Sequence, residues 1–125
     1  MKLGLTVLPG LYSVVRLAPG AKAPRGLTGF HSITRTEREL SIVCRAGEGP
    51  RARRREDGFR CLEVAGPFAF DAVGVLARLA APLARVRVPI LAISTFDTDY
   101  LLVREARLPA AVRALERAGH RVRVG

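Results

Sequence analysis

The sequence has few of the residues on which metal and redox sites depend. Its 125 residues include two cysteines, Cys44 and Cys61, and two histidines, His31 and His120, and no two of these are closely spaced. A zinc site needs clustered cysteine and histidine ligands. The sequence therefore predicts no metal centre and no cofactor. Both cysteines fall in strand-like runs, and we expect them to be buried thiols.

Long apolar segments are also missing. No run approaches the roughly 18 apolar residues that a transmembrane helix needs. The first residues, MKLGLTVLPG, lack a long apolar stretch followed by a small-residue cleavage site, so no signal peptide is predicted. We expect a soluble cytoplasmic protein with no membrane partner. Hydrophobic residues make up 49% of the chain, which is enough to build a core.

Lysine is scarce, with only Lys2 and Lys22, so almost all of the formal net charge of +10 comes from arginine. The densest basic run is Arg51–Arg55 (RARRR), which lies among glycine and proline and is predicted to be an exposed loop. No aromatic residue within it could stack on a base. The charge reflects either an arginine-rich composition or a surface for an acidic partner. Nucleic-acid binding through this loop is the weaker alternative.

The first half of the chain is predicted to hold strands and no long helix. Residues 18–29 are rich in proline and glycine and read as a loop. The predicted extended segments are 3–8, 12–17, 30–34 and 40–44.

From residue 60 onward the pattern predicts the order β-α-β-β-α-β. This is the ferredoxin-like order of an α+β fold, in which two helices pack on one face of an antiparallel sheet. The second helix is predicted to start at Pro109 and to stop before Gly119. The predicted strands are 60–64, 90–95, 99–103 and 121–124, and the first helix is 71–86.

The first helix has the clearest apolar period, which includes Val73, Leu76, Ala80 and Leu83. Asp71 is predicted to be its N-cap or a first-turn acid. Gly74 is explained equally well by the close approach of a ligand and by close packing of the helix on the sheet.

Residues 91–103 (LAISTFDTDYLLV) place hydroxyls and two carboxylates between apolar runs. Asp97 and Thr98 are typical turn residues, since their side chains bond to nearby backbone. As a calcium loop the segment lacks the glycine and the distal glutamate, and no Ser-His-Asp set or glycine-rich phosphate loop indicates an enzyme. A carboxylate at a strand end can instead bind an ammonium or guanidinium group, so a small-molecule site remains open.

The run ISTFDTDYLLV, together with GPFAFDAVGVLARLAAPLARVRVPILA before it, resembles a small bacterial family of ACT-domain proteins. That family is similar to the ACT domains of aspartate kinases and of cytosolic arginine sensors. The pieces LPGLYSVVRL, FHSITRT and ELSIVC resemble the family's degenerate first ACT unit. The resemblance implies a degenerate ACT-like unit over residues 1–59 and an ACT domain over residues 60–125.

The resemblance also implies a non-catalytic sensor or regulator that binds an amino acid and pairs its sheets in a homodimer. The alternative is a dimerisation or docking module without a ligand. Asp99 is the first candidate for contacting a cationic group and Asp97 the second. In related sensors the ligand touches the start of the first helix and the middle hairpin, which here are Asp71, Val73, Gly74, Thr95, Phe96, Asp97, Thr98 and Asp99.

Overall fold

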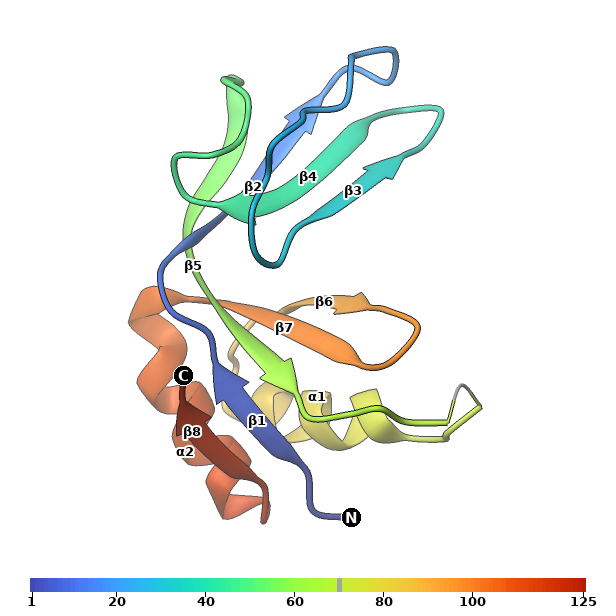
Figure 1. Ribbon diagram of the computed structural model, residues 1–125. Coiled ribbons are helices and arrows are strands. Elements are labelled where there is room, and N and C mark those ends of the chain that lie inside the picture. The colour runs from blue at the N-terminus through green and yellow to red at the C-terminus, as the bar shows by residue number, and fades with distance from the viewer. Residues whose placement is uncertain (70) are drawn as a thin grey trace. The chain divides into compact units, whose positions relative to one another are not determined.

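The computed structural model describes residues 1–69 and 71–125 and divides the chain into two compact units (Figure 1). The larger unit contains residues 1–9 and 60–125, and the smaller unit contains residues 10–59. In chain order the elements are β1 (Gly4–Val7), β2 (Tyr12–Leu17), β3 (Ser32–Arg35), β4 (Leu40–Arg45), β5 (Arg54–Val64), α1 (Val75–Arg85), β6 (Leu91–Ser94), β7 (Asp99–Arg104), the 3-10 helix η1 (Glu105–Arg107), α2 (Leu108–Arg117) and β8 (Arg121–Val124).

The larger unit confirms the predicted ferredoxin-like order, with one added strand. Its strands lie in the order β6-β7-β5-β1-β8. Strand β1 is antiparallel to β5, where Leu5 lies opposite Val64, and parallel to β8, where Leu5 lies opposite Val122. The N-terminal segment therefore separates two strands that would be neighbours in a four-stranded ferredoxin-like sheet.

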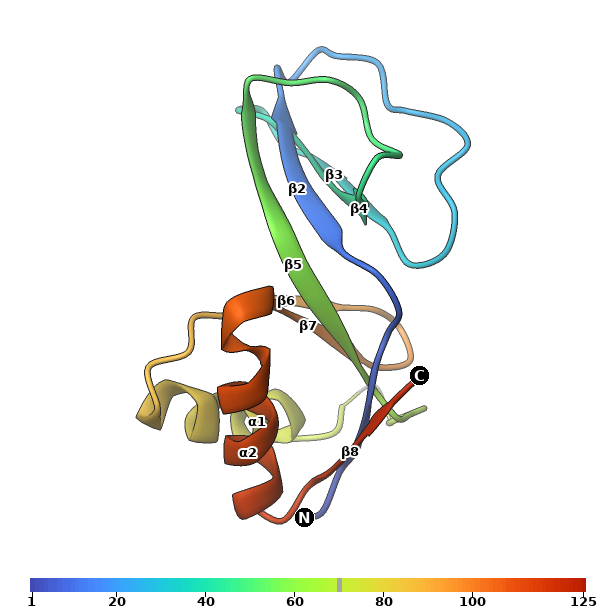
Figure 2. The ribbon, with the colours of Figure 1, turned by 90° about the vertical axis from the view of Figure 1, so that its left-hand side faces the viewer.

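Helices α1 and α2 cover one face of this sheet, and Figure 2 shows both on the same side of β1 and β8. The core forms where the two helices meet the strands, because each helix turns an apolar stripe toward the sheet. Its fully buried side chains include Leu5, Val64, Leu79, Leu83, Leu101, Val103, Ala111 and Leu115. None of the helices in the described part of the chain is long and apolar enough to cross a membrane.

Helix α1 begins later than the sequence pattern predicts. Gly74 precedes the first helical residue in a left-handed conformation, with φ of 83°, which L-residues rarely adopt. The predicted N-cap role of Asp71 is wrong, because Asp71 is exposed and lies three residues before Gly74. Val73 is also not part of the buried helical stripe, since 88% of its surface is exposed.

Helix α2 ends as predicted. Gly119 has φ of 97° and directly follows the cap residue Ala118. The amide of His120 donates to the carbonyl of Leu115 over 3.0 Å, and that of Gly119 donates to Glu116 over 3.0 Å. This is the pattern of a glycine-terminated helix, and it turns the chain sharply into β8.

The smaller unit is a sheet in the order β3-β4-β2, with the first part of β5 beside β2. None of its described residues forms a helix. The predicted basic loop is only partly a loop, because Arg54 and Arg55 lie in β5. One face of the sheet is covered by apolar side chains from the loops, and this cluster contains Val15, Leu17, Ala21, Leu27, Leu40, Ile42, Cys44 and Ala52.

Cys44 and Cys61 are both buried free thiols, as predicted. Burial raises the pKa of both, and it raises the pKa of Cys61 from its ordinary 9.0 to about 12. The folded protein therefore keeps the Cys61 proton at a pH where the unfolded chain has already released it.

We expect this difference to weaken the fold in alkali. Between about pH 9 and 12 the folded state holds more protons than the unfolded state, so stability falls as pH rises. For Cys61 the loss is about 2 kcal/mol between about pH 8 and 11. Urea unfolding of the wild type and of Cys61→Ala at about pH 8 and 11 measures this loss of stability. The variant should lose less stability between the two pH values. Equal losses in the two proteins would contradict the prediction.

Candidate functional site

A cavity of about 660 Å³ lies in the larger unit, between the start of α1 and the tip of the β6–β7 hairpin. Its lining combines an apolar part, from the segment that leads into α1, with hydroxyls and carboxylates from the hairpin. The lining residues are Phe68, Ala69, Ala72, Gly74, Val75, Leu76, Ala77, Ser94, Thr95, Phe96, Asp97, Thr98 and Asp99.

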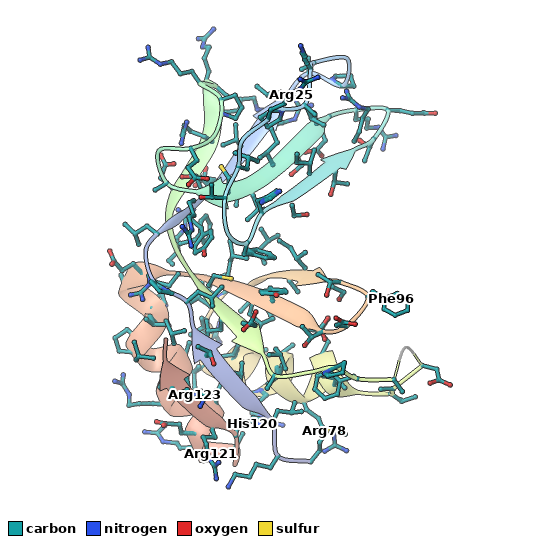
Figure 3. The ribbon with its side chains drawn as sticks, in the orientation of Figure 1. Arg25, Arg78, Phe96, His120, Arg121 and Arg123 are labelled. Carbon is teal, nitrogen blue, oxygen red and sulfur yellow. The ribbon has the colours of Figure 1, made fainter. Side chains whose placement is uncertain are left out.

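The hairpin tip is closed by bonds between Thr95 and Thr98. The amide of Thr95 donates to the carbonyl of Thr98 over 2.8 Å, and the amide of Thr98 donates to the Thr95 hydroxyl over 3.2 Å. The Thr95 hydroxyl thus accepts from a turn amide, that of Thr98, as threonine side chains in turns commonly do. Phe96 extends outward from this turn and is 79% exposed (Figure 3).

The segment after β5 is fastened to the same tip. The amide of Phe68 donates to the carbonyl of Asp97 over 2.9 Å, and the Thr98 hydroxyl donates to the carbonyl of Val64 over 2.7 Å. Gly66 lies so close to the tip that a β-carbon on it would be 2.9 Å from the carbonyl oxygen of Asp97 and 3.0 Å from the β-carbon of Thr98. These contacts fix the hairpin side of the cavity.

Gly66→Ala is therefore expected to push the hairpin tip away and to cost about 1–3 kcal/mol of stability. Gly20→Ala is the matched control, since a β-carbon there meets no atom within 4 Å. Thermal unfolding of the two variants measures the difference. An alanine at position 66 that is tolerated as well as one at position 20 would mean that the segment and the tip are not held together.

The start of α1 brings the amide groups of its first turn to the cavity. No side chain among the described residues caps the helix, and its first turn holds no acid. The first amide bonded within the helix is that of Arg78, which donates to the carbonyl of Gly74 over 3.0 Å. The amides of Val75, Leu76 and Ala77 precede it and have no intrahelical acceptor. This end of the helix carries partial positive charge and can attract an anion.

The two carboxylates of the hairpin give the cavity its negative charge. Asp99 is half-buried, and its Oδ1 accepts a hydrogen bond from the Ser94 hydroxyl, which orients it. Asp97 is exposed at the tip. Neither carboxylate forms an ion pair with any of the described residues. Both can therefore accept hydrogen bonds from a cationic group.

Six of the eight predicted site residues line this cavity together: Gly74, Thr95, Phe96, Asp97, Thr98 and Asp99. Asp71 and Val73 are exposed and are not among the lining residues. The prediction did not include Ser94, although Ser94 lies opposite Asp99 in the hairpin register and the alternation of the strands could have indicated it. It also did not include Phe68 and Ala69, for which the sequence holds no local signal.

No cluster of metal-binding side chains occurs among the residues that the structure describes. No group of three or more histidine, cysteine, aspartate or glutamate residues there could hold an ion.

Comparison with solved structures supports the fold. The crystal structure of a protein from Agobacterium tumefaciens superposes with a TM-score of 0.92 at 38% identity, and the match covers 100% of this chain and 95% of that one. A Vibrio cholerae protein of unknown function, described as a possible transport protein, superposes with a TM-score of 0.69 at 19% identity. The match covers 94% of this chain and 91% of the other. Aspartate kinase from Clostridium acetobutylicum superposes with a TM-score of 0.65 at 12% identity. The match covers 93% of this chain and 34% of that enzyme.

These likenesses define a ferredoxin-like α+β fold. The profile of the ACT domain matches residues 54–117, and the profile of an N-terminal domain matches residues 10–52. The chain belongs to the ACT-domain family. None of the curated proteins matches it.

Proposed function

We propose that the protein is a cytoplasmic, non-catalytic sensor that binds a free amino acid in the cavity between α1 and the β6–β7 hairpin. One observation carries the proposal: the amides of the first turn of α1 and two carboxylates that form no ion pair with the described residues belong to residues lining the same cavity. An amino acid carries the complementary charges, a carboxylate and an ammonium group. Each would form charge-assisted hydrogen bonds with its counterpart.

The two carboxylates favour a ligand with a cationic side chain, such as arginine or lysine. In this arrangement the α-carboxylate lies at the amides of Val75, Leu76 and Ala77, and the cationic groups lie at Asp99 and Asp97. Among the structural neighbours, aspartokinase III of Escherichia coli was solved in complex with aspartate and ADP, and the match covers 32% of that enzyme.

Isothermal titration with each of the twenty amino acids tests the proposal. We expect heat with arginine or lysine, and Asp99→Asn should weaken binding about tenfold, which corresponds to about 1.4 kcal/mol. Asp71→Asn is the matched control, because it removes the same charge from an exposed side chain outside the lining. Absence of heat and of any thermal shift with all twenty, in folded protein, would overturn the proposal.

The alternative is a dimerisation or docking module without a ligand. Sedimentation distinguishes this module from the amino-acid sensor. We propose a homodimer. A dimer whose mass and stability are unchanged by Asp99→Asn and by every amino acid would favour the alternative.

A further inference from the structure

The smaller unit has one sheet face that its apolar cluster does not occupy, here called the open face, and a row of polar side chains crosses it. Val15, Leu40 and Ile42 belong to the apolar cluster on the covered face. Side chains alternate between the two faces of a strand, so their neighbours Arg16 and Ser41 lie on the open face. Ser41 lies opposite Arg16 on one side, and Arg54 lies opposite Arg16 on the other.

Two positive charges therefore lie directly across from each other on neighbouring strands. Like charges in this position repel and destabilise a sheet. Arg53 and Arg54 form no ion pair with any of the described residues, and the Arg16 guanidinium donates to the carbonyl of Arg38 over 2.9 Å. Arg55 differs, because it pairs with Asp57 at 3.0 Å. The row is unfavourable for the unit by itself, and a bound anion would relieve the repulsion.

A shallow cavity of about 400 Å³ lies over this row. Arg55 is one of four arginines in its lining and is neutralised by Asp57, so the other three arginines and the two glutamates leave a formal charge of +1. The lining residues are Val14, Val15, Arg16, Glu39, Ser41, Arg53, Arg54, Arg55 and Glu56. Guanidinium groups bind phosphate oxygens in pairs of parallel hydrogen bonds, and the Ser41 hydroxyl adds a further donor.

We propose that this face of the smaller unit binds a small, multiply charged phosphate oxyanion through Arg16 and Arg54, with Arg53 beside them. One feature of the lining favours a small anion over a nucleic acid: no aromatic side chain in the lining could stack on a base. The proposal does not depend on the amino-acid site.

Inorganic pyrophosphate is the probe, and it is titrated at constant ionic strength into the full-length protein while unfolding temperature and heat are followed. We expect binding that raises the unfolding temperature. The double variant R16Q/R54Q should weaken binding at least about tenfold. The matched control K22Q/R25Q also removes two positive charges from the smaller unit, at exposed positions beside Ala21 and Leu27 of the covering cluster, and should bind as the wild type does.

A single-stranded oligonucleotide is the second arm of the experiment. If the oligonucleotide binds through Arg16 and Arg54 and pyrophosphate does not bind, the surface serves nucleic acid and the proposal is wrong. The proposal is also overturned if pyrophosphate leaves the wild type unchanged, or if R16Q/R54Q and K22Q/R25Q lose affinity equally, since net charge alone would then explain binding. Circular dichroism of both variants confirms that each is folded.

Discussion

Replacing Leu115 with alanine is expected to lower the free energy of unfolding by about 2–5 kcal/mol. Leu115 lies on α2, is 0% exposed, and belongs to the core cluster with Leu79 of α1 and Leu101 of β7. Truncation leaves a cavity among side chains held by two helices and a sheet, which cannot collapse without moving whole elements. The midpoint of urea unfolding measures the loss.

Arg113→Ala is the matched control, because Arg113 lies on the same helix and is exposed. It should change stability by no more than about 0.5 kcal/mol. If Leu115→Ala unfolds at the same urea concentration as the control, α2 does not pack on the sheet in the manner described. Such a result would also remove the support that this core gives to the start of α1.

Replacing His120 with alanine is expected to cost about 3 kcal/mol, because one buried and one partly buried backbone group lose their partner. His120 is 6% exposed, and its Nδ1 accepts a hydrogen bond from the amide of Leu3 over 3.1 Å. Its Nε2 lies 3.2 Å from the carbonyl oxygen of Arg78. Because Nδ1 accepts from Leu3, Nε2 is the ring nitrogen that is placed to donate to the Arg78 carbonyl. The ring joins the start of β1 to α1.

The bond to Arg78 has a cause in the sequence of α1. The carbonyl of Arg78 would normally accept from the amide four residues later, which is position 82. Pro82 occupies that position inside the helix and has no amide hydrogen. The imidazole therefore supplies the donor that the proline lacks.

A double-mutant cycle with Pro82→Ala tests this explanation. Alanine at position 82 restores a donor for the Arg78 carbonyl, so His120→Ala should cost less in that background, by about 1 kcal/mol. Urea unfolding of the wild type, both single variants and the double variant gives the coupling. Strictly additive losses would show that the histidine does not replace the missing helix bond.

Local sequence was enough to predict most elements of the larger unit. Strand alternation and helical periodicity depend on neighbours within a few residues, so the β-α-β-β-α-β order, the middle hairpin and the glycine stop of α2 were all predictable. The hairpin residues of the cavity, Thr95, Asp97, Thr98 and Asp99, were predicted from the family resemblance, and they lie within one turn and its flanks. The late start of α1 was missed, because apolar period alone cannot show that Gly74 takes a left-handed conformation.

The tertiary structure decided what depends on residues far apart in the chain. Strand β1 lies between β5 and β8, and the His120 contact with Leu3 spans 117 positions. The docking of Phe68 on the hairpin and the row of Ser41, Arg16 and Arg54 likewise need strands that pair only after folding. The physical reason is that periodicity fixes which face of an element is apolar, whereas strand order and register depend on the free energy of the whole packed unit.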